Sequence, residues 1–357
     1  MTSIDVLDLM LRSGAAGICL VLVARLAPLA ITTLPARFCA LFALGAAAYC
    51  IASSPVLRDV APVVAGSVKP FAIMSPIFFW WFGLSLFCDD WRWKPIYLVP
   101  MAFVSICMLL EWVSTSERTD AMANLASEAI HILLVLHVMR IIQVGFRDDL
   151  VEPRRRIRGW WLGAIGVTII GAAVVSALRL KTTISDTVLT LEALGLFFTT
   201  CLFSAWALSP HSDFFPAQVK PKAEPAMAEH QTADRRLIER LRSAMAAEAY
   251  RTAGLTVGRL SERLGVPEHR LRAVINRQLG YRNFSSFLNE YRIEAAKTAL
   301  SDPHKADTQI LHIALDLGYG SIAPFNRAFR DLTGDTPTGF RRKSLTKADA
   351  FNGGPSD

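Results

Sequence analysis

The sequence has 357 residues, of which 52% are hydrophobic, and its formal net charge is +7 at pH 7. This length favours two or three domains, and the apolar content is high for a soluble protein. Charged residues are sparse before Arg147 and dense after Asp234, which predicts a membrane part followed by a soluble part.

Residues 1–208 are predicted to form a bundle of about seven transmembrane helices. Each candidate has about twenty predominantly apolar residues, enough to cross a hydrocarbon core about 30 Å thick. The first candidate is the least clean because it carries Arg12 near one end, so a count of six stays open. The candidates are Ile4–Ala24, Phe38–Val56, Val68–Cys88, Pro95–Val113, Leu125–Val144, Trp160–Leu178 and Thr187–Leu208.

Loop charge indicates how this bundle is oriented. With seven helices the two termini face opposite sides, and basic loops favour the cytoplasm. The largest basic excess is the run from Arg147 to Arg158, on the same side as the C-terminus. We therefore expect a multi-pass protein of the bacterial inner membrane, with its C-terminal domain in the cytoplasm and the lipid bilayer as one partner.

The fifth candidate helix carries ionisable residues that could sense a signal. Glu128 and His131 are three residues apart, so they share one helix face and can touch. Ionisable groups inside a transmembrane helix are costly and suggest a function. The alternative is structural, with Glu128 at the outer interface and His131 packed in the bundle beside a hydrogen-bond partner.

Neither catalytic nor metal-binding chemistry is indicated. The sequence shows no GxSxG, HExxH or P-loop pattern, so we do not expect an enzyme. The six cysteines lie in or beside apolar stretches without metal-ligand spacing. We therefore expect no metal and no cofactor.

A change in composition marks the end of the membrane part. Residues 209–234 are polar and rich in proline, which predicts an extended linker. A DNA-binding domain is expected at 235–347, with its core at 255–342, followed by a disordered tail at 348–357. From Arg235 to Lys347 there are 20 Lys and Arg against 11 Asp and Glu, a balance typical of a nucleic-acid-binding module.

Two helix pairs are predicted inside that core. The first joins Leu255–Leu264 to Glu268–Leu279 through a turn at Gly265, where glycine permits a sharp bend. The second joins Thr308–Leu317 to Ile322–Leu332 through Gly318. Two helices with a tight glycine turn form a helix-turn-helix unit, whose second helix enters the major groove. A longer helix, Phe284–Leu300, is expected between the pairs with Asn283 as its N-cap.

Two longer motifs stand out in this core, Ile310-x-x-Ile313-Ala314-x-x-x-Gly318-Tyr319-x-Ser321-x-x-x-Phe325-x-Arg327-Ala328-Phe329-Arg330 and Gly334-x-Thr336-Pro337-x-x-Phe340-Arg341. With the first helix pair they make up about ninety residues that resemble the AraC/XylS family of transcription regulators. The resemblance implies an all-α fold with two helix-turn-helix units that bind double-stranded DNA. Similarity to members with multi-span N-terminal parts implies a membrane-bound one-component regulator.

Residues that face outward on the two second helices are the candidates for DNA contact. In the first unit they are His269, Arg270, Arg272, Ala273, Asn276 and Arg277. In the second unit they are Ser321, Ile322, Ala323, Asn326, Arg327 and Arg330. The apolar start of the second helix departs from the polar residues of many family members. The first unit is therefore the better candidate for base contacts, since Arg pairs with guanine and Asn with adenine.

The function expected from these features is transcriptional regulation controlled by an unknown signal at the membrane. A homodimer is expected because linking two modest binding modules raises affinity, and RNA polymerase is a further expected partner. Two alternatives stay open. The bundle could be a transporter or an enzyme with a fused regulatory domain, or it could serve only as an anchor.

Overall fold

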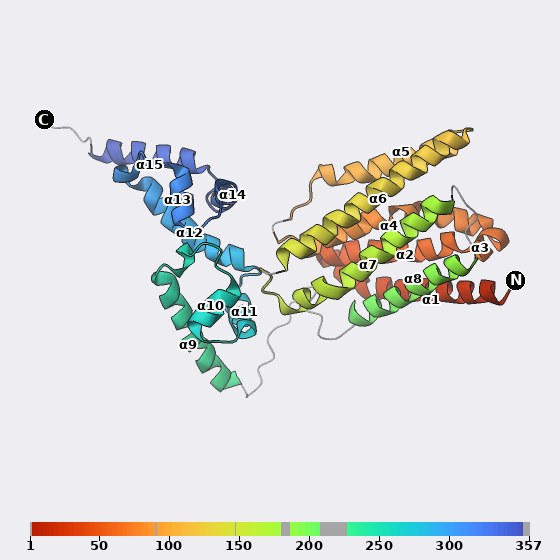
Figure 1. The fold of residues 1–357 in the computed structure, drawn as a ribbon, viewed down its shortest axis with the longest axis horizontal. Coiled ribbons are helices and arrows are strands. Elements are labelled where there is room, and N and C mark those ends of the chain that lie inside the picture. Colours follow the sequence, from red (N-terminus) through yellow and green to blue (C-terminus); the bar gives the residue numbers. More distant parts are fainter. Residues whose placement is uncertain (1, 90, 147, 180–185, 208–226, 353–357) are drawn as a thin grey trace. The chain divides into compact units, whose positions relative to one another are not determined.

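The computed structural model describes residues 2–89, 91–146, 148–179, 186–207 and 227–352, and its fold is all-α (Figure 1). Within these residues the sole β-type pairing is an isolated bridge between Asp149 and Asn283. The chain divides into two compact units. Unit 1 comprises Met1–Phe146 and Pro153–Lys220, and unit 2 comprises Arg147–Glu152 and Pro221–Asp357. The chain therefore enters unit 2 twice.

Unit 1 is a bundle of long helices that run alongside one another (Figure 1). Helix α2 packs against α1 and α4, α8 packs against α1, and α6 packs against α4 and α5. Small residues allow close approach, since a Cβ added at Gly45 on α2 would lie 2.9 Å from the Cβ of Ser75 on α4. The helices are α1 (Ser3–Thr32), α2 (Leu34–Ser53), α3 (Pro55–Val60), α4 (Pro62–Phe87), α5 (Val99–Val113), α6 (Glu117–Gly145), α7 (Glu152–Arg179) and α8 (Asp186–Ala207).

Six helical stretches among the described residues are long and apolar enough to cross a membrane. They are Ser3–Thr32, Leu34–Ser53, Pro62–Phe87, Pro95–Val113, Glu117–Gly145 and Thr187–Ala205, and each overlaps one of the seven predicted spans. The remaining predicted span lies in α7, whose described apolar part, Gly163–Val175, is shorter.

The described part of unit 2 contains seven α-helices around one hydrophobic core. They are α9 (Met227–Ala246), α10 (Val257–Leu264), α11 (Glu268–Arg277), α12 (Phe284–Ser301), α13 (Ile310–Asp316), α14 (Ile322–Thr333) and α15 (Pro337–Asn352). Helix α12 contacts α13, α14 and α15, and α10 contacts α11. The core includes Leu260, Leu271, Phe287 and Phe329, all of them fully or almost fully buried.

Both ends of unit 2 differ from the sequence prediction. The helix expected from Arg235 begins at Met227, inside the predicted linker, and the rest of that linker lies outside the described residues. At the other end α15 continues to Asn352, so the segment 348–357, predicted to be disordered, begins as helix. Residues 353–357 lie outside the described part.

Candidate DNA interface and cavity

The first helix-turn-helix unit is formed by α10 and α11. The Thr256 side chain caps α10 by accepting a hydrogen bond from the Arg259 backbone N–H at 3.2 Å. Gly265 ends α10 with a φ of +59°, a left-handed conformation that favours glycine. Helix α11 begins directly after Pro267. The predicted turn residue and the predicted helix pair are therefore confirmed, and the inward positions Leu271, Val274 and Ile275 are buried.

Helix α12 lies between the two helix-turn-helix pairs in sequence, and both pairs pack with it in the hydrophobic core of unit 2. The Asn283 side chain caps it by accepting a hydrogen bond from the Ser286 backbone N–H at 2.7 Å, as predicted. Phe284 and Phe287 of its first turn are buried, with ring centroids 5.9 Å apart. The 18 residues of α12 give it a length of about 27 Å.

In the second helix-turn-helix pair, the turn between α13 and α14 contains a closely packed glycine. Gly318 has a φ of +85°, and a Cβ placed there would lie 2.6 Å from the backbone oxygen of Arg251. Next to it, the Arg292 side chain donates from Nε to the Tyr250 carbonyl oxygen at 2.8 Å. The Arg292 guanidinium also lies 5.1 Å from the ring centroid of Tyr319. Burial lowers the pKa of Arg292 and raises that of Tyr319 to about 12.

The predicted DNA-contact residues of α11 do not share one environment. His269 and Arg277 are exposed, and Ala273 is half-buried. Arg270 lies 3.4 Å from Asp234 of α9, with both side chains part-exposed. Asn276 donates from Nδ2 to the Tyr281 carbonyl oxygen at 2.8 Å, so its amide nitrogen holds the turn after α11.

Arg272 is buried, whereas the sequence pattern predicted that it faces outward. Its relative exposure is 4%. Its Nη1 donates to the Asp149 carbonyl oxygen at 2.5 Å, and its Nε donates to Oε1 of Glu268 at 2.9 Å. A second nitrogen, Nη2, also contacts Glu268. The side chain is covered because residues 148–150, which precede α7 in the chain, pack on this part of unit 2.

The predicted residues of α14 lie together at the surface. Ser321 is the N-cap residue of α14 and is exposed, as are Ile322 and Ala323 of its first turn. Arg327 and Arg330 are exposed on the following turns, and Asn326 is half-buried. The opposite face of the helix, with Phe325 and Phe329, is fully buried. Helix α14 therefore presents a surface that is apolar at its start and basic farther along.

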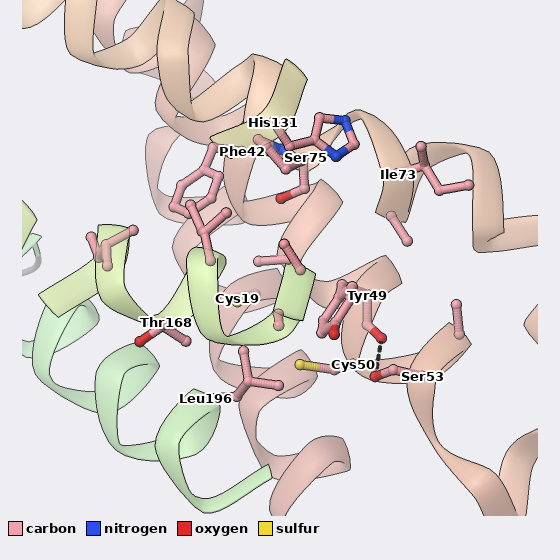
Figure 2. Close-up of a pocket in the computed structure, with 18 of the residues that line it drawn as sticks. Cys19, Phe42, Tyr49, Cys50, Ser53, Ile73, Ser75, His131, Thr168 and Leu196 are labelled. Carbon is pink, nitrogen blue, oxygen red and sulfur yellow. Dashed lines mark hydrogen bonds between the residues drawn. The ribbon is translucent and has the colours of Figure 1, made fainter. Parts of the chain in front are cut away.

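Unit 1 contains a cavity of about 520 Å³, within the size range of small-molecule sites. Residues from all eight helices α1–α8 line it. Figure 2 shows Tyr49, Ser53, His131, Thr168 and Leu196 around this space. Most of the wall is apolar, while hydroxyl, imidazole and charged groups are present at several points. Such a wall suits a ligand with an apolar body and a few hydrogen-bonding groups.

The two predicted sensing residues meet in this wall. His131 Nδ1 lies 3.6 Å from Oε2 of Glu128, and the His131 side chain is almost fully buried. No described residue hydrogen-bonds to Nε2 of His131, nor to the buried hydroxyls of Ser127 and Ser204, which also line the cavity. Buried polar atoms without hydrogen-bond partners cost free energy, so binding of a ligand that supplied those partners would be favourable.

A buried ionic cluster in unit 1 was missed by the sequence analysis. Arg12, fully buried, donates from Nε to Asp8 at 2.9 Å, and its Nη2 lies 3.4 Å from Glu192 of α8. Glu192 also accepts a hydrogen bond from the Tyr49 hydroxyl at 2.5 Å, and Arg12 donates to the Ser53 hydroxyl at 2.5 Å. The spacing of Asp8 and Arg12, four residues apart within an apolar stretch, was the available signal.

No group of three or more metal-ligating side chains occurs among the described residues. The six cysteines are all free thiols in this structure.

Comparison with known proteins finds similarity in the C-terminal part of the chain. A family model described as a helix-turn-helix domain matches residues 260–343, which contain α11 to α14. Three uncharacterized HTH-type transcriptional regulators of Staphylococcus aureus, from strains MSSA476, N315 and MW2, are each 39% identical to this chain over 95 residues. The aligned part is 26% of this chain and 12% of each relative, so the chain covers a small fraction of their length.

No solved structure matches this chain at a significant level. The family match and the geometry agree on the C-terminal part, which carries an AraC-type helix-turn-helix domain and resembles transcription regulators. The helices of unit 1 lie outside the matched residues.

Proposed function

We propose that this protein is a membrane-bound one-component transcription regulator, which binds promoter DNA through α11 and α14 and responds to a signal received in unit 1. The observation that carries the proposal is the presence in one chain of two helix-turn-helix units and, among the described residues, six helices long and apolar enough to cross a membrane. A DNA-binding module tied to such helices can couple an event at the membrane to promoter occupancy.

The outer surface of unit 1 supports its placement in a bilayer. Large apolar side chains are exposed on several of its helices, including Val21 at 61%, Ile106 at 57%, Leu133 at 61% and Phe198 at 63%. Soluble monomers rarely expose contiguous apolar patches of more than a few hundred Å². Lipid tails would cover these side chains, whereas the backbone hydrogen bonds are already made within each helix.

The path of the chain supports a seven-span topology. Residues 148–152 belong to unit 2, so the end of α6 and the DNA-binding module must face the same side of the membrane. Helices α7 and α8 separate them in the chain, and an even number of crossings is needed. Since α8 is long and apolar enough to cross, we infer that α7 crosses as well, through the apolar stretch Trp160–Leu178 that the sequence predicts as a span. We place that shared side in the bacterial cytoplasm.

On this proposal the exposed residues of α11 and α14 contact DNA. Two recognition helices joined by α12 can reach neighbouring segments of the major groove, whose repeat is about 34–36 Å. His269 of α11 and Arg327 of α14 are exposed in the structure and are the candidates for DNA contact in the two units. The apolar start of α14 favours contacts with thymine methyl groups or with phosphates.

The cavity of unit 1 is the proposed place for the signal. Glu128 and His131 lie in its wall beside buried polar atoms without described partners. A ligand that binds there can shift the protein between states only if it binds one state more tightly than the other. The chemistry of the wall favours an amphiphilic small molecule.

The experiment that tests the function is selection of bound duplexes from a random library by the full-length protein in lipid nanodiscs. We expect enrichment of a defined motif, with binding that weakens steeply as salt rises. His269→Ala and Arg327→Ala should each relax the preference at one part of the motif or weaken binding. Retention of no duplex by the folded full-length protein would refute the proposal.

A second candidate function is a transporter or enzyme with a fused regulatory module, and the charged groups in the cavity wall favour it. The two can be separated with the double variant Glu128→Gln/His131→Asn. Under the regulator proposal this variant changes promoter control in cells. Under the alternative it abolishes uptake or turnover and leaves promoter control intact.

A further inference from the structure

The short segment between α6 and α7 forms part of unit 2. The Leu150 backbone N–H donates to the Arg282 carbonyl oxygen at 3.0 Å, and the Phe284 backbone N–H donates to the Asp148 carbonyl oxygen at 2.9 Å. Asp149 and Asn283 are thereby paired as in an antiparallel ladder. The segment is thus held by main-chain hydrogen bonds at the start of α12.

Side chains fix the same segment in place. Leu150 is 2% exposed and belongs to the hydrophobic core of unit 2, together with Leu271 of α11 and Phe284 of α12. On the other side of the ladder, the Ser285 hydroxyl donates to a carboxylate oxygen of Asp148 at 2.8 Å. A buried leucine and a paired carboxylate show that this contact is specific.

The segment covers Arg272, one of the residues of α11 that the sequence predicts to contact DNA. Arg272 is the third residue of the outward set on α11, after His269 and Arg270, yet its guanidinium is buried against the Asp149 carbonyl oxygen and Glu268. Arginine recognises guanine with two parallel N–H donors that must be free of other partners. In the observed arrangement these donors already have partners within the protein.

We propose that residues 148–151 act as an intramolecular occupant of the α11 interface, and that they must leave before Arg272 can contact DNA. The proposal rests on the proposed DNA-binding function and adds its regulation. The segment follows α6, which carries His131, and precedes α7, which carries Thr168, and both residues line the cavity. A ligand that shifts α6 or α7 would therefore displace one end of the segment.

A reversible disulfide tests this arrangement in the full-length protein. Asp149 and Asn283 form a non-hydrogen-bonded antiparallel pair, for which the Cα atoms are about 4.5 Å apart, within the range that a disulfide spans. Asp149→Cys/Asn283→Cys should therefore cross-link on oxidation and reopen with reductant. The native cysteines all precede residue 202, so peptide mapping separates the new bond from any other.

The readout is binding of the selected duplex to the protein in nanodiscs. We expect the oxidised variant to bind about 5- to 150-fold more weakly than the same protein after reduction, which corresponds to the loss of one bidentate arginine–base contact. Adding Arg272→Ala should weaken the reduced form and abolish the difference between the redox states. Wild-type protein and the two single-cysteine variants serve as controls, and their binding should not change with oxidation.

Two results would overturn the inference. One is a mapped disulfide with equal duplex binding before and after reduction, and the other is failure of the two cysteines to cross-link. Failure of the proposed function itself looks different, because then neither redox state of any variant retains a duplex.

Discussion

The turn of the second helix-turn-helix unit offers a quantitative test of the structure through Gly318→Ala. Gly318 has a φ of +85°, and the left-handed conformation costs an alanine about 1–2 kcal/mol. The new Cβ would also lie 2.6 Å from the Arg251 backbone oxygen and 2.8 Å from Nη2 of Arg292, so both contacts must open. Overpacking of this kind costs about 1–3 kcal/mol. Together we expect a local destabilisation of about 2–5 kcal/mol.

Hydrogen–deuterium exchange on the full-length protein is the appropriate assay, because it reports local stability in a chain of more than one unit. A loss of 2 kcal/mol speeds exchange from the opened state about 30-fold, and larger losses speed it further. We expect this acceleration in peptides from α13, α14 and residues 249–255, while peptides from α1–α8 keep their rates.

Gly320→Ala is the matched control, two residues along in the same turn. Its φ is not in the left-handed region, and no heavy atom would lie within 4 Å of the added Cβ. Exchange in this control should match the wild type or slow slightly. Equal exchange in the two variants would show that the turn does not have the crowded conformation described here.

Four further predictions concern single residues. Arg12→Ala should lower the free energy of unfolding of unit 1 by about 3–5 kcal/mol, because the buried carboxylates of Asp8 and Glu192 lose their cation. The loss should appear as a large fall in the thermal unfolding temperature in detergent, and an unchanged temperature would contradict the described cluster. His131→Phe should change the same stability by no more than about 1 kcal/mol, because Nε2 of His131 has no described partner and Nδ1 lies 3.6 Å from Glu128, too far for a hydrogen bond. A loss as large as that of Arg12→Ala would show that His131 is structural. If the Arg327 side chain contacts a phosphate, Arg327→Ala should reduce the slope of log affinity against log salt concentration by about 1 in duplex titrations. An unchanged slope with relaxed preference at one base would assign the side chain to base recognition instead. Burial raises the pKa of Tyr319 from 10.0 to about 12, so between these pH values the phenol stays protonated in the folded state and ionises in the unfolded state. The free energy of unfolding is therefore unaffected below pH 10 and falls between pH 10 and 12. Tyr319→Phe should remove this contribution to the loss of exchange protection.

Local sequence patterns were sufficient for most of the helices of unit 2. Gly265, Asn283 and Gly318 mark boundaries that the structure confirms, because turns and N-caps depend on residues close together in sequence. Apolar periodicity likewise identified the buried faces of α11 and α14. The start of α9 at Met227 was missed, since its first turns are polar and carry no apolar stripe.

Long-range contacts account for what the sequence did not show. The partner that buries Arg272 lies 123 residues earlier in the chain, and Glu192 lies 180 residues from Arg12. No periodicity within one helix can report such a neighbour. The cavity has the same origin, because its wall is assembled from eight helices and only Glu128 and His131 were recognisable in advance.

The most direct test of the central claim is footprinting of the full-length protein, in nanodiscs, on the duplex that selection enriches. Two helix-turn-helix units joined by α12 predict two protected patches about one helical turn apart on the same face of the DNA, both weakened by rising salt. A single short patch, or protection without any preference for the enriched sequence, would contradict the account that α11 and α14 bind DNA together.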